Sequence, residues 1–253
     1  MTHTAGTMYD APQWVIAPEN LTLSENQVHI WRAFLTASRQ IRASMEPVLS
    51  EEERTRAARF YFERDRHRWI IARAILRMLL ARYLQLEPQH VLFISNEYGK
   101  PALAPAHKSK LQFNLSHSRD IALYAVARGR AVGVDVEYMK DDIDYDDLAK
   151  VSFSPQEQVV LRSLAGEAKR TAFFNCWTRK EAYIKARGMG LSLPLDLFDV
   201  SLLPGEAAAL LASREDPREG DRWTLQALFP CTGYAGALAV EGSGWQLSCW
   251  QWI

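Results

Sequence analysis

The stretch Gly133-Val-Asp-Val-Glu137, in the middle of the chain, limits the possible folds more than any other segment. Valines alternate with the other residues here, and a period of two is typical of a strand with one apolar face. Because side chains two residues apart lie on the same side of a strand, Asp135 and Glu137 present two carboxylates roughly 7 Å apart at Cα. Burying two like charges is costly unless a cation balances them, which favours Mg²⁺ with a substrate phosphate. The alternative is an exposed strand whose charges are screened by water.

A further carboxylate and a lysine occur together in Trp177-Thr-Arg-Lys-Glu-Ala-Tyr-Ile-Lys185. We expect a helix over 168–187, on which Glu181 and Lys185 share a face because they are four residues apart. Glu181 then completes a site of three carboxylates or acts as a general base, and Lys185 binds a phosphate oxygen. The alternative is a surface ion pair that stabilises the helix by about 0.3–0.5 kcal/mol.

Several polar and basic residues in the first half suit an anionic ligand. Ser116 and His117 do not form a catalytic dyad, since neighbours in an extended chain point apart, but at a strand end His117 can donate to an anion beside the serine hydroxyl. Lys100 lies in a glycine- and proline-containing turn and reaches a phosphate if that turn faces a cleft. The arginines of 50–68 line a polyanion pocket or cover a solvated helix face. A structural histidine and an exposed turn lysine are the corresponding alternatives.

The order of elements is similar in the two halves of the chain. Each half offers a strand, a short helix opened by a capping box (Ser50 with Glu53, Ser154 with Glu157), a long helix and several strands. We expect the long helices from Asp65 to about residue 84 and over 168–187. The strands are expected at 28–35, 91–94, 111–115, 121–127, 132–137, 197–202, 223–229, 234–240 and 245–250.

This order predicts an α+β protein of two similar lobes, with a ligand site between them. The first lobe is expected over 1–128, with an irregular lead-in over 1–26, and the second lobe, which carries the acidic site, over 129–253. The 30 basic and 30 acidic residues give a net charge of zero, which argues against a general nucleic-acid binder. Three cysteines without a CxxC pair favour a reducing, cytoplasmic setting, and no apolar run is long enough to span a membrane.

Six blocks of the sequence, within roughly 49–200, together resemble the signatures of Sfp-type 4′-phosphopantetheinyl transferases. They include the two acidic stretches described above. The other four are Tyr98-Gly-Lys-Pro101, Phe113-Asn-Leu-Ser-His-Ser118, Phe153-Ser-Pro-Gln-Glu157 and Gly190-Leu-Ser-Leu-Pro-Leu195. The resemblance implies two lobes related by a pseudo-twofold, each a small, mostly antiparallel sheet packed against a long helix, with the active site between the lobes.

The resemblance also implies an activity of the holo-[acyl-carrier-protein] synthase type. Such an enzyme transfers the 4′-phosphopantetheine arm of coenzyme A to a serine of an apo acyl or peptidyl carrier protein and releases adenosine 3′,5′-bisphosphate. It uses Mg²⁺, or Mn²⁺ in its place, and we expect a cytoplasmic monomer that binds neither nucleic acid nor membrane. Fatty acid, polyketide and nonribosomal peptide synthesis all remain open as destinations.

Residue roles follow from the resemblance by position. Asp135, Glu137 and Glu181 would bind the metal, Glu181 would also deprotonate the carrier serine, and Lys185 would contact the pyrophosphate. The residues expected at the nucleotide end of coenzyme A are Arg56, Lys100, Pro101, Ser116 and His117, with His117 near the 3′-phosphate. The stretch Lys150-Val-Ser-Phe153 lacks the second aromatic residue that the family often has there. This difference concerns contacts with the carrier protein, not the chemistry.

Two other classes of protein remain as alternatives. A metal-dependent phosphohydrolase or nuclease would use the same acids, although a nuclease normally carries a basic excess that this chain lacks. A non-catalytic module that binds coenzyme A or a carrier protein would have little use for three carboxylates and a lysine. Release of free phosphate would favour the first alternative, and ligand binding without any reaction would favour the second.

Overall fold

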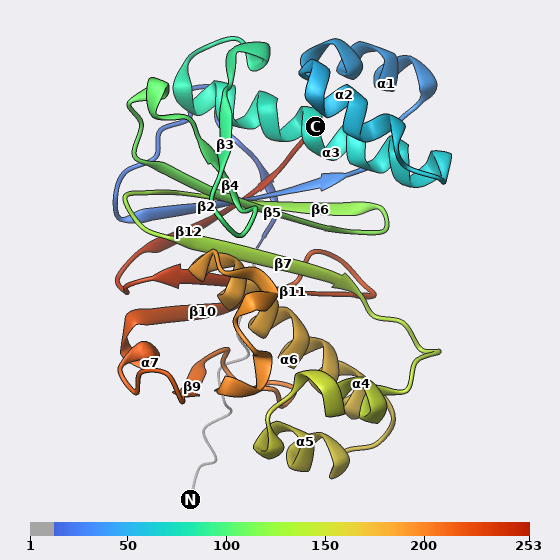
Figure 1. Ribbon diagram of the computed structural model, residues 1–253, viewed down its shortest axis with the longest axis vertical. Coiled ribbons are helices and arrows are strands. Elements are labelled where there is room, and N and C mark those ends of the chain that lie inside the picture. The colour runs from blue at the N-terminus through green and yellow to red at the C-terminus, as the bar shows by residue number, and fades with distance from the viewer. Residues whose placement is uncertain (1–12) are drawn as a thin grey trace, which may run out of the picture.

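The computed structural model describes residues 13–253, and the first part of the predicted lead-in lies outside this range. Two lobes are stacked, with their sheets in the middle and a long helix on each outer side (Figure 1). One sheet has five strands in the order β1-β12-β2-β6-β5, and the other has three in the order β10-β11-β7. The predicted mixed α+β fold with two lobes is therefore confirmed.

The first lobe packs the long helix α3 against one face of the five-stranded sheet. Its core joins Ile71, Ile75 and Leu79 of the helix to Tyr124 and Val126 of the sheet. The elements of this part of the chain are β1 (Val15–Ile16), β2 (Gln27–Phe34), α1 (Arg39–Met45), α2 (Glu51–Ala58), α3 (Glu63–Leu84), β3 (Phe93–Ser95), β4 (Pro101–Leu103), β5 (Leu111–Ser118) and β6 (Ile121–Arg128).

The second lobe packs the long helix α6 against the three-stranded sheet, with Phe173, Ile184 and Ala237 in its core. Short α4 and α5 lie beside the helix. The elements are β7 (Val132–Tyr138), α4 (Tyr145–Ser152), α5 (Pro155–Arg162), α6 (Gly166–Arg187), β8 (Phe198–Val200), β9 (Leu210–Ser213), α7 (Glu219–Arg222), β10 (Trp223–Leu228), β11 (Tyr234–Glu241) and β12 (Gln246–Gln251).

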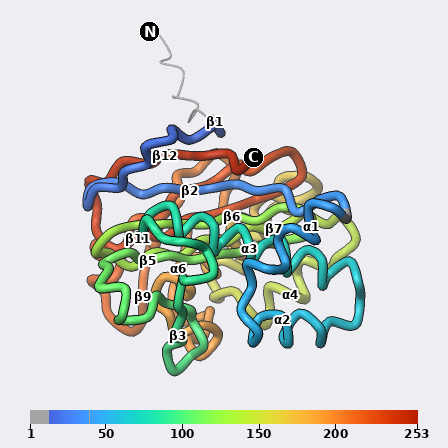
Figure 2. The backbone as a smooth tube through the Cα atoms, turned by 90° about the horizontal axis from the view of Figure 1, so that it is seen from above, coloured from blue at the N-terminus to red at the C-terminus, as the bar shows by residue number. Residues whose placement is uncertain are grey.

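The last strand does not stay with the second lobe. β12 pairs in parallel with β2, and β1 adds to its other edge, so that strands from the two ends of the chain run side by side (Figure 2). Cys249 of β12 packs in the core between the sheets together with Ile30 of β2. The division at residue 128 stays a prediction for the chain as a whole, and the structure adds this return of residues 246–251 to the first sheet.

Both predicted capping boxes are present, at the starts of the short helices α2 and α5. Ser50 and Ser154 accept from the backbone N–H of Glu53 and Glu157, whose carboxylates accept from the serine N–H in return. The start of α3 differs from the prediction: the helix begins at Glu63, and Asp65 lies in its first turn.

Buried ion pairs extend the similarity between the lobes. Arg77 on α3 donates to Glu53 and to the carbonyls of residues 88 and 91. Lys180 on α6 donates to Glu157 and to the carbonyls of residues 195 and 198. In each lobe, a basic residue of the long helix thus joins the capping box to the loop that precedes a strand.

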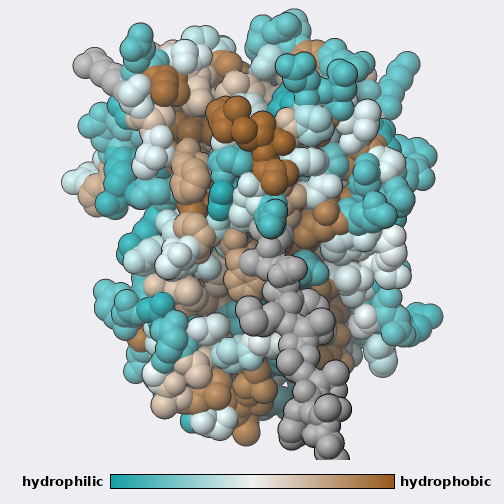
Figure 3. Space-filling view, turned by 180° about the vertical axis from the view of Figure 1, so that it is seen from behind, coloured by the Kyte–Doolittle hydropathy of each residue, from teal (hydrophilic) through white to brown (hydrophobic). Residues whose placement is uncertain are grey.

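The outer face behind the view of Figure 1 includes apolar side chains where the described chain begins (Figure 3). There β1 contributes the exposed residues Val15 and Ile16. Within residues 13–253, no helix has both the length and the apolar composition to cross a membrane.

Candidate active site

The two sheets meet along a seam between β5 and β7, which side chains rather than a backbone ladder hold together. Alternation along β5 places Asn114, Ser116 and Ser118 on the side that faces β7. The amide oxygen of Asn114 accepts from the N–H of residue 134 at 2.9 Å. The hydroxyl of Ser116 donates to Asp135 Oδ1 and that of Ser118 to Glu137 Oε2, both at 2.8 Å. The predicted pair of acids therefore lies at the junction between the lobes.

A close approach between β7 and α6 brings the third acid and the lysine to this seam. A Cβ on Gly133 would lie only 2.1 Å from the carbonyl oxygen of Ala182 and 2.3 Å from the backbone nitrogen of Ala186. Only glycine leaves room for the helix at this point. Gly133 in β7 thus lets α6 pack close enough to bring Glu181 and Lys185 next to Asp135 and Glu137.

Among residues 13–253, Lys185 is the one cation in direct contact with these acids. Its Nζ donates to Asp135 Oδ1 at 2.6 Å and to the Ser116 hydroxyl at 3.0 Å. Burial acts to lower the pKa of Lys185, but Asp135, Glu181 and Glu137 together outweigh this effect and raise the pKa. The lysine is therefore held in its charged form by the carboxylates around it.

The neighbouring carboxylates carry more negative charge than one lysine balances. Burial, followed by the charge of Asp135, raises the pKa of Glu137 to about 7, although Ser118 and Lys185 oppose the shift. Burial also raises the pKa of Glu181, with a further contribution from Asp135. Burial is the larger cause of both shifts, and a cation bound between these acids would favour their ionised forms.

An unpaired oxygen supports the same conclusion. Asp135 is only 2% exposed, and its Oδ2 has no hydrogen-bond partner within residues 13–253. A buried carboxylate oxygen left without a partner is costly, and hard oxygen donors suit Mg²⁺. In the described part of the chain, no three acidic, cysteine or histidine side chains are already gathered as a ready ligand set. Even so, the unpaired Oδ2 of Asp135 and the neighbouring carboxylates are hard oxygen donors of the kind that a divalent cation prefers, while Lys185 donates to Oδ1 of Asp135.

A cavity of about 790 Å³ adjoins Lys185 and Ser116. Its size is in the range of pockets that enclose a cofactor-sized ligand. It lies between α2, α3, the hairpin of β3 and β4, and β5. Its basic and aromatic lining consists of Arg56, Trp69, Arg73, Arg77, Phe93, His117 and Lys185.

The predicted Arg56 lines this cavity, together with Arg73, which the sequence analysis missed. Arg56 lies over the Trp69 ring at 5.8 Å, and Arg73 lies over the Phe93 ring at 4.2 Å while it pairs with Glu53. The signal for Arg73 was its position on α3 one turn before Arg77, on the side that faces the capping box. Only the structure shows that this side also faces a cavity.

His117 and Pro101 also line the cavity, and their assignment to the nucleotide end of coenzyme A stays a prediction. The ring of His117 is accessible to solvent but lies within the concave surface. Burial by the surrounding protein, and then the charges of Lys185 and Arg68, lower its pKa. Ser116 lines the cavity, but its hydroxyl already donates to Asp135 and accepts from Lys185.

Lys100 is the predicted residue that the structure places elsewhere. Its backbone neighbours Gly99 and Pro101 line the cavity, but its Nζ turns away and donates to two carbonyls, those of Val132 and Ala186, both at 3.1 Å. The expected contact of this ammonium with a nucleotide phosphate stays a prediction, which these two hydrogen bonds do not support. The sequence could not show this, because both acceptors are distant in the chain.

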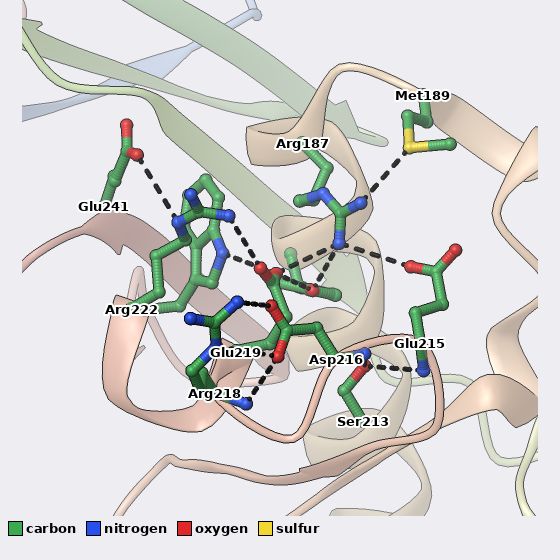
Figure 4. Close-up of polar contacts among 11 residues, drawn as sticks. Arg187, Met189, Ser213, Glu215, Asp216, Arg218, Glu219, Arg222 and Glu241 are labelled. Carbon is green, nitrogen blue, oxygen red and sulfur yellow. Dashed lines mark hydrogen bonds and ion pairs between the residues drawn. The ribbon is translucent and has the colours of Figure 1, made fainter.

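A second ionic cluster holds the same end of α6 from the other side. Glu219, at the start of α7, accepts from the Tyr183 hydroxyl at 2.5 Å, from Arg187 at 3.0 Å, from Arg222 at 2.9 Å and from Trp223 Nε1 at 2.8 Å (Figure 4). Because the Glu219 carboxylate accepts from four donors, both of its oxygens are occupied by hydrogen bonds within the protein. The cluster is structural, and it fixes the turn of the helix that carries Lys185.

The fold and the site define the class of protein: a two-lobed α+β protein with carboxylates and a lysine beside a basic cavity. Two family models match the chain in succession. The model described as 4′-phosphopantetheinyl transferase, N-terminal, matches residues 35–128, and that of the 4′-phosphopantetheinyl transferase superfamily matches residues 131–239.

Named proteins are similar over most of the chain. The 4′-phosphopantetheinyl transferase HetI of Nostoc sp. is 40% identical over 240 residues, which cover 94% of this chain and 98% of HetI. A putative 4′-phosphopantetheinyl transferase of Synechocystis sp. is 34% identical over 79% of this chain and 78% of its own. The 4′-phosphopantetheinyl transferase Sfp of Bacillus subtilis is 36% identical over 61% and 66%. The chain therefore belongs to the 4′-phosphopantetheinyl transferase family and is a transferase enzyme.

Proposed function

We propose that this protein transfers the 4′-phosphopantetheine arm of coenzyme A to a serine of an apo acyl or peptidyl carrier protein. The observation that carries the proposal is the position of Lys185, which contacts Asp135 and also lines the basic cavity. A ligand with a nucleotide in that cavity would place its pyrophosphate at the lysine and the carboxylates. Coenzyme A has this arrangement of charges.

In this proposal, Asp135, Glu137 and Glu181 hold Mg²⁺, for which Mn²⁺ can substitute. The bound cation supplies positive charge that offsets the negative charge of the pyrophosphate. Lys185 binds a pyrophosphate oxygen. Arg56, Arg73 and His117 bind the phosphorylated ribose end, while Pro101 forms part of the cavity wall.

The reaction requires the carrier serine to lose a proton as it attacks. Its oxygen forms a bond to the phosphorus that bears the pantetheine arm, and the bond from that phosphorus to the bridging oxygen breaks. Glu181 accepts the proton, directly or through water, and its raised pKa makes it a better acceptor near neutral pH. Adenosine 3′,5′-bisphosphate leaves with the bridging oxygen.

The proposed setting is the cytoplasm, with the protein acting as a monomer. All three cysteines lie in the described part of the chain and are free, which suits a reducing compartment. Both sides of the seam come from one chain, with Ser116 and Ser118 from the first lobe and the acids from the second. A second copy is therefore not needed to complete the carboxylate cluster.

Intact-protein mass spectrometry of apo carrier proteins tests the proposal. After incubation with this protein, coenzyme A and Mg²⁺, a carrier should gain the mass of one phosphopantetheine group, and EDTA should prevent the gain. Carriers from fatty acid, polyketide and nonribosomal peptide synthesis should be compared. The absence of a gain on every carrier, combined with a failure to bind coenzyme A, would refute the proposal. Release of inorganic phosphate would point to a phosphohydrolase.

A further inference from the structure

The hairpin formed by β3 and β4 connects the basic cavity to the opposite lobe. One side of it contributes Ser95, Gly99 and Pro101 to the cavity wall. Its other side presents Asn96 and Lys100 to the C-terminal turn of α6. The same short loop therefore touches both the proposed nucleotide pocket and the helix that carries Lys185.

Asn96 organises the loop and joins it to the helix. Its Oδ1 accepts from the backbone N–H of Tyr98 at 3.0 Å and of Lys100 at 2.8 Å, which closes the loop around the asparagine. Its Nδ2 donates to the carbonyl of Gly188 at 2.7 Å, across the two lobes. Gly188 ends α6 at a φ of +74°, and a Cβ there would lie 3.2 Å from both Asn96 Nδ2 and Lys100 Cδ. The loop is thus packed tightly on the helix end.

Lys100 makes the second connection. Its Nζ donates to the carbonyls of Ala186, in the last turn of α6, and Val132, the first residue of β7. Both acceptors are uncharged carbonyls, and burial lowers the pKa of the Lys100 ammonium to about 8. The carbonyls at the C-terminus of a helix carry partial negative charge and lack partners within the helix. Lys100, which belongs to the first lobe, supplies a positively charged donor to one of these carbonyls, that of Ala186.

We propose that Asn96 and Lys100 form an interlobe latch that positions the last turn of α6, and with it Lys185, against the cavity. Lys100 is then a positioning residue and not a nucleotide ligand. A ligand that presses on Gly99 and Pro101 would order the hairpin and, through the latch, the end of α6. Only the catalytic consequence of the latch rests on the proposed function. Its structural part stands on the contacts themselves.

Two variants remove one connection each. Lys100→Met keeps the apolar stem of the side chain but removes the ammonium. Asn96→Asp keeps the oxygen that closes the loop but loses the donor to Gly188. Lys110→Met is the matched control, since the Lys110 side chain is 75% exposed and lies outside the hairpin. If Lys100→Met fails to fold, Asn96→Asp still tests the latch.

Hydrogen exchange is the first measurement, because it does not depend on transfer activity. Amide exchange should become at least about tenfold faster at residues 182–188 in both latch variants and stay unchanged in the control. Wild-type protection of this segment in both variants would overturn the latch. If the wild-type protein neither modifies any carrier nor binds coenzyme A, the proposed function fails, yet this measurement still decides about the latch.

Calorimetric binding of coenzyme A and of 3′-dephospho-coenzyme A separates the latch from a nucleotide contact. The latch predicts that Lys100→Met keeps the ratio of the two affinities within about threefold of the wild-type ratio. A lysine bound to the 3′-phosphate would instead make the two ligands bind nearly equally, and that result would overturn the proposal. In the transfer assay, kcat should fall at least about tenfold while the KM for coenzyme A changes little.

Discussion

Lys180 lies inside a signature block of the family, yet the structure gives it a structural task. Its side chain is fully buried, and its Nζ donates to Glu157 Oε2 at 2.8 Å and to the carbonyls of Leu195 and Phe198 at 2.7 and 2.6 Å. Replacing Lys180 with Met keeps most of the volume but leaves the buried Glu157 without its cation. Breaking a buried pair in this way costs about 3–5 kcal/mol of unfolding free energy.

Urea unfolding, followed by fluorescence of the eight tryptophans, measures this loss. The midpoint should fall with little change in slope. Glu157→Gln in the Lys180→Met background should recover part of the loss, because the unpaired charge is then gone. A Lys180→Met protein that unfolds within about 1 kcal/mol of the wild type would refute the reasoning, as would one that keeps full stability but loses coenzyme A binding.

Three further outcomes follow from the contacts described. Burial lowers the pKa of His29 to about 4, so the unfolded chain binds its proton more readily. Unfolding free energy should therefore be lost as pH falls from about 6.5 toward 4, by up to about 3 kcal/mol, and a His29→Gln protein titrated in urea should lose less. Gly133→Ala should destabilise by at least about 1–3 kcal/mol in the same assay, because its Cβ would overlap α6, and unchanged stability would contradict this close approach. Lys185→Ala should lower kcat in single-turnover transfer more than it weakens carrier binding, and an unchanged rate would count against its phosphate contact.

Local signals predicted the parts of the fold that local contacts decide. Ser50 and Ser154 open their helices as expected, because a capping box is formed within four residues. The start of α3 was misplaced because Phe62 caps it without a side-chain bond, while Asp65 looked like the better cap. Asp144 caps α4 in the same local way, by accepting from the backbone N–H of Asp147.

Long-range pairing was the part that the sequence could not show. The parallel pairing of β12 with β2 joins residues more than two hundred positions apart. No sequence feature of either strand identifies the strand with which it pairs. The same reason applies to the site. Spacing alone predicted that Asp135 and Glu137 share a face and that Glu181 and Lys185 do so on a helix. The turn of Lys100 toward α6 depends on how the lobes are placed.

The central claim is that the carboxylates and Lys185 form one site with the basic cavity, for a metal and coenzyme A together. Calorimetric titration of coenzyme A into the wild-type protein, with and without Mg²⁺, tests this claim most directly when it is repeated with Glu137→Ala. The account predicts that Mg²⁺ strengthens binding to the wild type and has little effect on the variant. Equal affinity with and without Mg²⁺ in the wild type, or an undiminished Mg²⁺ effect in the variant, would contradict it.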